Sequence, residues 1–431
     1  MQTLNEINPF LDNIGDDVMG FLNEVQLQYT DAISFASGRP EERHFGIENF
    51  SEYIAAFVDF MAAALHKKPH EIMQHLGQYN RAKGIINEQI SAYLRTDENI
   101  HVTPEDITIT VGSQEAMTLA VTTLVDREKD IIIVEDPTYV GLTHFSIIGG
   151  YQVSPVPVSE EGISLHVLEE KLIEHSKEGK KVKLVYVIPD FQNPTGTSMP
   201  LANRYKLLEL AETYDFLILE DNAYGEFVYG RDPVPSIKAL DKYKRVIYMR
   251  SFSKTLYPSL RLSAMVTDRS VVRNGVAVKL NDLLAKTKGY TTVNTSTLTQ
   301  AILGGILIKN NCSLKEINRE KVASMQQKRD QVLNALCSHI NTEENSWAEN
   351  ISWNVPDGGF FATIKVPFAV CKTDVEKCAA TFKVIFTPMS FFFLADGGNK
   401  EIRIAFSNLS PEQIHTGIGR LVDYFKYRLS N

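Results

Sequence analysis

The chain has 431 residues, a length that predicts two or three domains rather than one simple core. Hydrophobic residues make up 44% and charged residues 23%, as in an ordinary soluble globular protein. The net charge of -9, with no block of lysine and arginine, argues against a nucleic-acid partner.

The N-terminal region and the cysteines predict a cytoplasmic location. No lysine or arginine precedes Arg39, whereas acidic residues do, so neither a secretory signal nor a mitochondrial presequence is expected. The longest apolar runs, such as Ala301–Ile308, are too short to span a bilayer, so we expect no membrane partner. The cysteines have no CxxC spacing, and we expect reduced thiols with no zinc site and no disulfide framework; they are Cys312, Cys337, Cys371 and Cys378.

Between about residues 100 and 270, short apolar runs alternate with longer amphipathic stretches. The runs are rich in isoleucine and valine with little alternation, which is typical of strands covered on both faces. The amphipathic stretches include Leu165–His175 and Ala202–Tyr214, which predict helices. This order predicts an α/β domain with a mostly parallel sheet between two layers of helices. The predicted strands are Ile107–Val111, Ile131–Val134, Leu184–Ile188, Phe216–Leu219, Val246–Met249 and Leu262–Val266.

After residue 300 the pattern changes. A long, charged amphipathic stretch at Ser313–Ile340 predicts a helix that leaves the first domain. Short strand patterns and a last helix at Pro411–Arg428 then predict a smaller α+β domain; the strand patterns are Phe360–Val366, Val384–Phe386 and Glu401–Phe406. We expect residues 46–309 to form the large domain, and residues 1–45 and 310–431 the small one, although composition alone does not place the first 45 residues.

Polar residues follow five of the six predicted strands of the large domain. Ser113 and Gln114 come after a glycine at the start of a predicted helix, where free backbone N–H groups suit a phosphate. Tyr139 follows the second strand, and an aromatic ring there can lie flat on a heteroaromatic ring. Asn193 lies in an Asn-Pro-Thr-Gly turn after the third. Taken singly, each also fits an ordinary turn or core residue.

The two remaining strand ends carry charged groups. Asp221 follows Phe216–Leu219, and a buried carboxylate there needs a cationic partner such as a protonated pyridine nitrogen. Lys254 follows the next strand, where a buried lysine can lose its proton and attack a carbonyl. Ser251, Ser253 and Arg261 flank this lysine with groups that suit a phosphate dianion. Five polar strand ends at one carboxyl edge of an open α/β sheet predict a ligand site there.

With these motifs, the chain resembles the class I/II aminotransferases, pyridoxal-5′-phosphate enzymes of fold type I. The likeness runs from Ile33–Pro40 to Arg403–Ser407 and therefore covers nearly the whole chain. The seven-residue spacing from Lys254 to Arg261 is similar to that of the 2-aminoadipate and kynurenine aminotransferase subgroup. The resemblance implies a homodimer with shared active sites.

The resemblance also implies a role for each residue. Lys254 would form the Schiff base with the cofactor and carry a proton, Asp221 would pair with the ring nitrogen, and Tyr224 would hydrogen-bond the ring oxygen together with Asn193. Tyr79 would reach the phosphate of the dimer partner. The full set implied to hold pyridoxal phosphate is Ser113, Gln114, Tyr139, Asn193, Asp221, Tyr224, Ser251, Ser253, Lys254, Arg261 and Tyr79.

On the substrate side, the resemblance implies that Arg403 clamps the α-carboxylate with the Gly38 backbone and Asn193 nearby. From the sequence alone, Arg403 could also be a half-exposed strand residue. Arg39 could contact a distal carboxylate, as in glutamate or 2-aminoadipate, or could face solvent. The Met389–Phe393 stretch departs from the family pattern and leaves the substrate open.

The expected function is amino transfer between an L-amino acid and a 2-oxo acid. One alternative is another reaction of the same cofactor at Cα or Cβ, namely decarboxylation, β-elimination or oxidation. A second is the ligand-sensing module of a GntR-type transcription regulator, but the segment before Ile33 carries no basic side chain that would fit a DNA-binding domain. A non-catalytic structural protein would have no use for a lysine, an aspartate and a phosphate site at one sheet edge.

Overall fold

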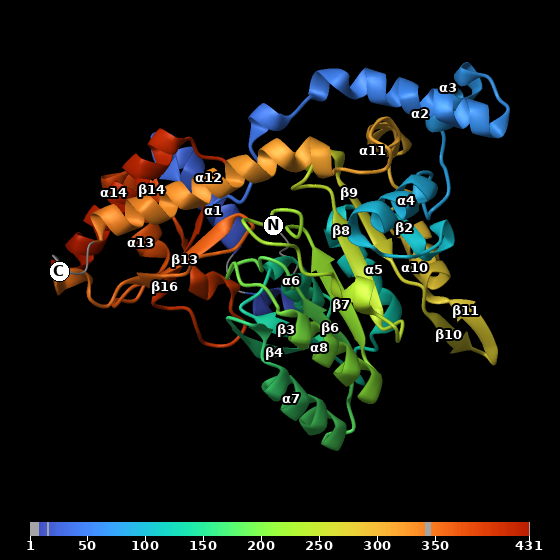
Figure 1. Cartoon of the computed structure of the whole chain (residues 1–431). Coiled ribbons are helices and arrows are strands. Elements are labelled where there is room, and N and C mark those ends of the chain that lie inside the picture. Colours follow the sequence, from blue (N-terminus) through green and yellow to red (C-terminus); the bar gives the residue numbers. More distant parts are fainter. Residues whose placement is uncertain (1–7, 15–16, 341–345, 431) are drawn as a thin grey trace, which may run out of the picture.

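The computed structural model describes residues 8–14, 17–340 and 346–430. Within them the largest element is an eight-stranded sheet with the order β2-β9-β8-β7-β6-β3-β4-β5 (Figure 1). All six strands predicted for the large domain lie in this sheet, and β2 and β9 have the predicted bounds. The strands are β2 (Ile107–Val111), β3 (Asp130–Asp136), β4 (Gln152–Ser159), β5 (Gly162–Ile163), β6 (Lys181–Val187), β7 (Leu217–Asn222), β8 (Val246–Ser251) and β9 (Leu262–Val266).

Six strands of this sheet run in the same direction and end at the same edge. β4, β3, β6, β7 and β8 form a run of parallel pairs. β9 is antiparallel to both β8 and β2, so β2 and β8 run in the same direction. The carboxyl ends of β2, β3, β4, β6, β7 and β8 therefore lie at one edge, and β9 and the short β5 are the antiparallel strands of this mostly parallel sheet.

Both faces of the sheet are buried. Ile131 and Ile133 of β3 belong to one apolar core, whereas Ile132 and Val134 belong to the core on the other face. This explains the unbroken apolar runs. The helices of this part are α2 (Phe50–Leu65), α3 (Pro69–Leu76), α4 (Asn87–Glu98), α5 (Gly112–Leu124), α6 (Val140–Ile148), α7 (Leu165–Lys177), α8 (Leu201–Thr213), α9 (Ile237–Leu240), α10 (Leu280–Gly289) and α11 (Thr297–Lys309), and a hairpin of β10 (Ser270–Arg273) and β11 (Val276–Lys279) precedes α10.

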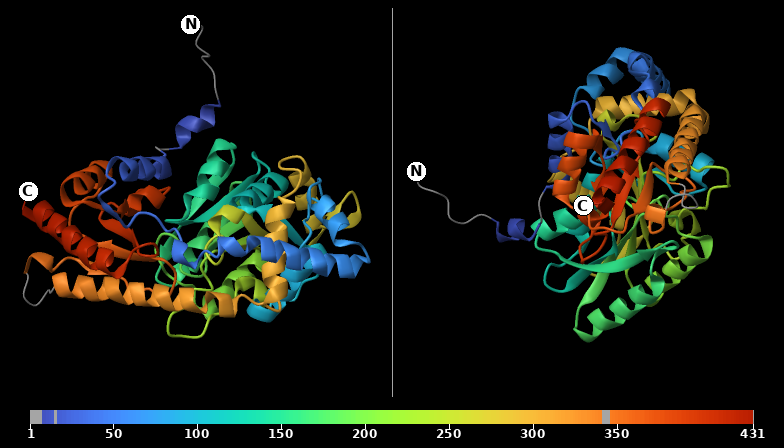
Figure 2. Two further views of the ribbon diagram at one scale, coloured as in Figure 1. Left: turned by 90° about the horizontal axis from the view of Figure 1, so that it is seen from above. Right: turned by 90° about the vertical axis from the view of Figure 1, so that its left-hand side faces the viewer.

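A second core surrounds a four-stranded antiparallel sheet with the order β12-β13-β16-β15. The N-terminal helix α1 (Val18–Gln28) joins this core through Val18, Leu22 and Val25. The long helix α12 (Lys315–His339) runs from the large sheet to this core (Figures 1 and 2). The other elements are β1 (Ile33–Ser34), β12 (Ser352–Trp353), β13 (Phe361–Lys365), β14 (Val384–Ile385), β15 (Thr387–Pro388), β16 (Glu401–Ala405), α13 (Lys372–Lys377) and α14 (Pro411–Ser430).

The segment before α1 reaches the large sheet's helices. Asn8 Nδ2 donates to the carbonyl oxygen of Ile148 at the end of α6, at 2.9 Å. The N-terminal region thus contacts α6 through Asn8 and the second core through α1. No helix in the described part of the chain has both the length and the apolarity needed to cross a lipid bilayer.

A buried carboxyl group supports the sheet edge. Glu135, near the end of β3, accepts hydrogen bonds from the Ile188 amide at 3.0 Å and from Gln192 Nε2 at 3.2 Å. Gln192 in turn accepts from the Thr195 amide, which braces the turn around Asn193. Burial raises the pKa of Glu135 to about 8, and the hydrogen bonds only partly oppose this.

This raised pKa predicts a pH-dependent effect of Glu135→Gln. Between the ordinary glutamate pKa of 4.5 and about 8, the folded protein keeps a proton that the unfolded chain releases, so the wild-type free energy of unfolding falls as pH rises. The slope is about 1.4 kcal/mol per pH unit at most. Glutamine cannot ionise, so the free energy of unfolding of Glu135→Gln should rise relative to that of wild type from pH 5 to pH 8, at up to this slope. The melting temperature of the variant should rise relative to wild type over the same range. A difference that stays constant would contradict the assignment; the exposed Glu160→Gln variant serves as control.

Candidate active site

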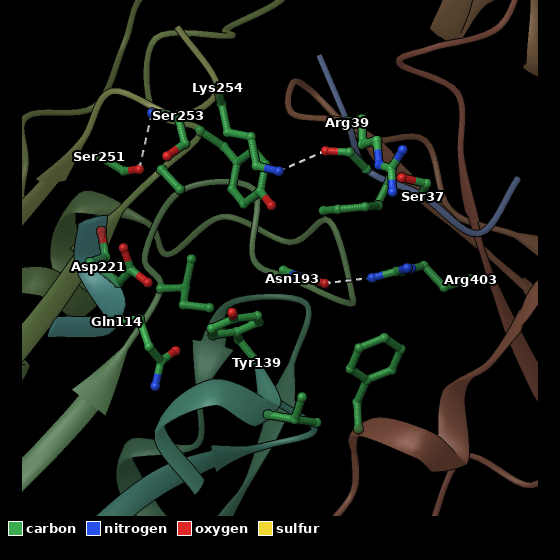
Figure 3. Close-up of a pocket in the computed structure, with 18 of the residues that line it drawn as sticks. Ser37, Arg39, Gln114, Tyr139, Asn193, Asp221, Ser251, Ser253, Lys254 and Arg403 are labelled. Atoms are coloured by element: carbon green, nitrogen blue, oxygen red, sulfur yellow. Dashed lines mark hydrogen bonds between the residues drawn. The ribbon is translucent and has the colours of Figure 1, made fainter. Parts of the chain in front are cut away.

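A cavity of about 340 Å³ lies at the shared carboxyl edge of the large sheet and extends to the second sheet. All but one of the residues predicted for the site line it, and Figure 3 shows many of them around one space. The exception is Tyr79, which is 82% exposed and lies outside the cavity. The predicted residues in the lining are Gly38, Arg39, Ser113, Gln114, Tyr139, Asn193, Asp221, Tyr224, Ser251, Ser253, Lys254, Arg261 and Arg403.

Lys254 extends into the cavity from the segment after β8. Its Nζ donates to the Gly38 carbonyl oxygen at 2.7 Å (Figure 3). Burial lowers the pKa of Lys254 to about 8, and the positive charges of Arg403, Arg261 and Arg39 add to this, while Asp221 opposes it. An amine with such a pKa exchanges its proton near neutral pH.

Asp221 lies at the end of β7 and is 6% exposed. Its Oδ2 accepts a hydrogen bond from the Tyr186 hydroxyl at 3.0 Å, whereas its Oδ1 has no partner among the described residues. Burial raises the pKa of Asp221 to about 6, against the hydrogen bond from Tyr186 and the charge of Lys254. Sequence reasoning missed Tyr186; the available signal was one hydroxyl in an otherwise aliphatic run.

The turn after β2 packs against Arg261. Gly112 has a φ of +69°, a backbone conformation that favours glycine, and a Cβ there would lie 2.5 Å from Arg261 Nη2. Arg261 Nη1 is 3.3 Å from Ser253 Oγ. Ser113 and Gln114 occupy the first turn of α5 on the same side of the cavity. Hydroxyls, a guanidinium and a helix N-terminus together suit an anion.

Arg403, in β16, faces the cavity from the second sheet and is 3% exposed, not half-exposed. Its Nη1 donates to Asn193 Oδ1 at 2.8 Å and its Nη2 to the Ala36 carbonyl oxygen at 2.6 Å (Figure 3). The guanidinium lies 4.5 and 4.7 Å from the ring centres of Phe361 and Phe392. Burial lowers the pKa of Arg403 to about 10, which leaves it charged at neutral pH.

Part of the lining was not predicted. Three residues come from α1, which packs on the second core and thereby reaches the cavity. No local pattern in the sequence marks such a contact, because it depends on tertiary packing. The unpredicted lining residues are Leu22, Asn23, Gln26, Ala36, Ser37, Met117, Val140, Ile188, Ala223, Phe361 and Phe392.

These residues fit a flat heteroaromatic cation that carries a phosphate. The buried Asp221 Oδ1 can accept from a protonated ring nitrogen, Arg261 and the serines can bind a phosphate, and Lys254 can bond to an aldehyde. Pyridoxal phosphate has all three features. The described residues contain no group of three or more His, Cys, Asp or Glu that could hold a metal ion.

Comparison with known proteins agrees with this fit. The family model for aminotransferase class I and II matches residues 51–421. The chain is 39% identical to an (S)-3,5-dihydroxyphenylglycine transaminase of Amycolatopsis orientalis over 95% of this chain and 92% of that protein. It is 29% identical to a 2-aminoadipate transaminase of Thermus thermophilus over 90% and 89%.

A solved structure has the same fold. The kynurenine aminotransferase of Pyrococcus horikoshii, in complex with PMP, superimposes with a TM-score of 0.81 at 29% identity and covers 98% of this chain and 97% of that one. The predicted fold, cofactor and subgroup resemblance are therefore confirmed. The chain belongs to the class I and II aminotransferases of fold type I, and it is an enzyme that transfers amino groups with pyridoxal phosphate.

Proposed function

We propose that the enzyme transfers the amino group of an aromatic or other large apolar L-amino acid, with the cavity residues in the roles that follow. Bound pyridoxal phosphate supplies an aldehyde and an electron-withdrawing ring that acidifies the Cα–H of a bound amino acid. Lys254 anchors the cofactor and then, as a free amine, moves the proton from Cα. Its pKa of about 8 supports this, since it can both release and accept a proton near neutral pH.

Asp221 keeps the ring nitrogen protonated. The support is its buried, unpartnered Oδ1 together with the hydrogen bond that Tyr186 donates to Oδ2. Tyr139 lines the cavity and stacks on the ring, while Tyr224 and Asn193 hydrogen-bond the ring oxygen. The residues assigned to the phosphate are Ser113, Gln114, Ser251, Ser253 and Arg261.

Arg403 binds the substrate α-carboxylate, with Gly38 beside it. The guanidinium is already oriented by Asn193, Ala36 and two aromatic rings, so little side-chain freedom is lost when a carboxylate binds. Among the described residues its Nε has no hydrogen-bond partner and remains free to donate.

The substrate side chain meets an apolar wall. Leu22, Val140, Phe361 and Phe392 line the cavity, which suits an aromatic ring. The arylglycine and kynurenine in the names of two relatives are aromatic amino acids of this kind. Arg39 is exposed at the same cavity and is assigned to the distal carboxylate of a dicarboxylic partner, such as glutamate or 2-aminoadipate.

The assembly and location are proposals as well. Tyr79 and Tyr290 are 82% and 86% exposed, and large exposed aromatic residues suit a subunit interface. We assign the chain to a homodimer in which Tyr79 reaches the partner's phosphate, to the cytoplasm because its described cysteines are free, and to no nucleic-acid role because of its charge of -9. The proposed domains are residues 46–309, and residues 1–45 with 310–431, the latter grouping supported by the shared second core.

A panel of amino donors tests the substrate assignment. Aromatic donors should convert the bound cofactor to its amino form with a kcat/KM at least about tenfold above that of alanine, because the ring contacts the apolar wall. Absorbance and product mass give the readout. Lys254→Ala should lose the visible absorption of the lysine–cofactor bond, and Arg39→Ala should weaken glutamate but leave aromatic donors within about twofold.

Three results would contradict these assignments. Equal rates with alanine and aromatic donors would show that the apolar wall does not recognise the substrate side chain. Retention of the visible band in Lys254→Ala would show that Lys254 does not bond to the cofactor. Glutamate activity that is as high in Arg39→Ala as in wild type would contradict the contact between Arg39 and a distal carboxylate.

Sedimentation equilibrium tests the assembly. We expect a species of twice the 48.5 kDa chain mass at micromolar concentration. We also expect Tyr79→Ala to weaken cofactor retention more than exposed Tyr205→Ala does, because only Tyr79 is assigned to the phosphate. A monomer with full activity would exclude the shared site.

A further inference from the structure

A row of polar side chains on α12 is buried behind the active site. Asn318, Lys321, Ser324 and Lys328 recur at helical spacing and share one face. They are 1%, 8%, 7% and 3% exposed. A helix face that packs on a protein core is normally apolar, and burying a lysine ammonium is costly unless it is paired. This polar row therefore requires partners.

Two of its members are tied to segments on the substrate side. Lys328 Nζ donates to the Ser407 carbonyl oxygen at 2.9 Å, and Ser407 Oγ donates to the Arg39 carbonyl oxygen at 2.6 Å. Lys328 also lies 3.0 Å from Glu41 Oε2. The Ser324 hydroxyl accepts from Arg43 Nη2 at 2.6 Å. The ends of the segments that carry Arg39 and Arg403 are thus held by α12.

The other two members face the cofactor side. Asn318 Nδ2 donates to the carboxylate of Glu226, two residues after Tyr224. Lys321 Nζ donates to the Thr255 carbonyl oxygen at 2.6 Å, and Thr255 is the residue after Lys254. Lys321 also lines a small cavity together with Lys254. Figure 1 shows α12 running along one side of the molecule.

We propose that Lys321 is a positioning residue for amino transfer, which fixes the backbone of the Lys254 segment through the Thr255 carbonyl. The inference rests on the anchoring role assigned to Lys254 above. Lys254 lies between β8 and the short helix of Pro258–Leu260, outside any regular helix or strand, so the sheet ladder does not hold its backbone. Its amine must nevertheless reach two places in turn, the cofactor and the Cα proton, and such geometry tolerates little displacement.

The buried charge of Lys321 is consistent with this role. Burial lowers the pKa of Lys321 to about 8, and Glu226 opposes the shift. A methionine would fill the same space without the cost of burying a charge, so packing alone does not account for a lysine at this position. The ammonium gives the Thr255 carbonyl a strong, charge-assisted donor.

Lys321→Met in the holoenzyme removes the donor and nearly keeps the shape. We expect kcat to fall by about tenfold or more with the KM of the amino donor within about twofold, because chemistry loses alignment while binding does not. The midpoint of the pH titration of the visible absorption band should also shift. Lys321→Gln keeps a donor without the charge and should give intermediate values of both. Lys315→Met makes the same change at an exposed site of α12 and should match wild type.

The proposal would be overturned if either Lys321 variant had the kcat and titration midpoint of Lys315→Met. This holds even if the variant has a lowered melting temperature. If Lys321→Met does not fold, Lys321→Gln decides alone by the same comparison. The role of Lys254 is separated by Lys254→Ala. Loss of the visible band there, with Lys321 variants that match Lys315→Met, would overturn only the positioning role; a retained band would overturn both.

Discussion

The site depends on one electrostatic constraint, the carboxylate of Asp221 buried at the end of a central strand. Burial alone raises the pKa of such a group, and the Tyr186 hydroxyl stabilises only one of its two oxygens. The protein therefore holds a negative charge whose natural partner is a cation on a flat ring. Lys254 and Arg261 line other sides of the same cavity, and in the proposed assignment the three residues would bind the ring nitrogen, the aldehyde and the phosphate of the cofactor.

The substrate side of the cavity is built from backbone as much as from side chains. The Ala36 carbonyl accepts from Arg403, the Gly38 carbonyl from Lys254 and the Arg39 carbonyl from Ser407. This short segment near the N-terminus thus joins the two sheets at the site. In the proposed reaction, the Lys254 amine would leave its acceptor on the segment that also contacts Arg403, which would link the proposed cofactor and substrate sites through one loop.

The sequence predicts the large sheet well and the cavity only in part. Strands such as β2 and β9 are predicted to the residue because both faces are buried and the apolar run is unbroken. The polar strand ends follow from that, since parallel strands share an edge. The direction of β9 is not predicted, because apolar content does not distinguish parallel from antiparallel pairing. The hairpin of β10 and β11 is not predicted either.

The contacts that remained hidden are tertiary. α1 reaches the cavity through the second core, Tyr186 supports Asp221 from a neighbouring strand, and α12 reaches Thr255 across the back of the site. None has a local signature. The most direct test of the role of Asp221 is the ¹⁵N chemical shift of the ring nitrogen in protein loaded with labelled pyridoxal phosphate. We expect a protonated nitrogen across the neutral range and loss of that proton in Asp221→Asn; an unprotonated nitrogen in the wild-type protein would contradict the role of Asp221.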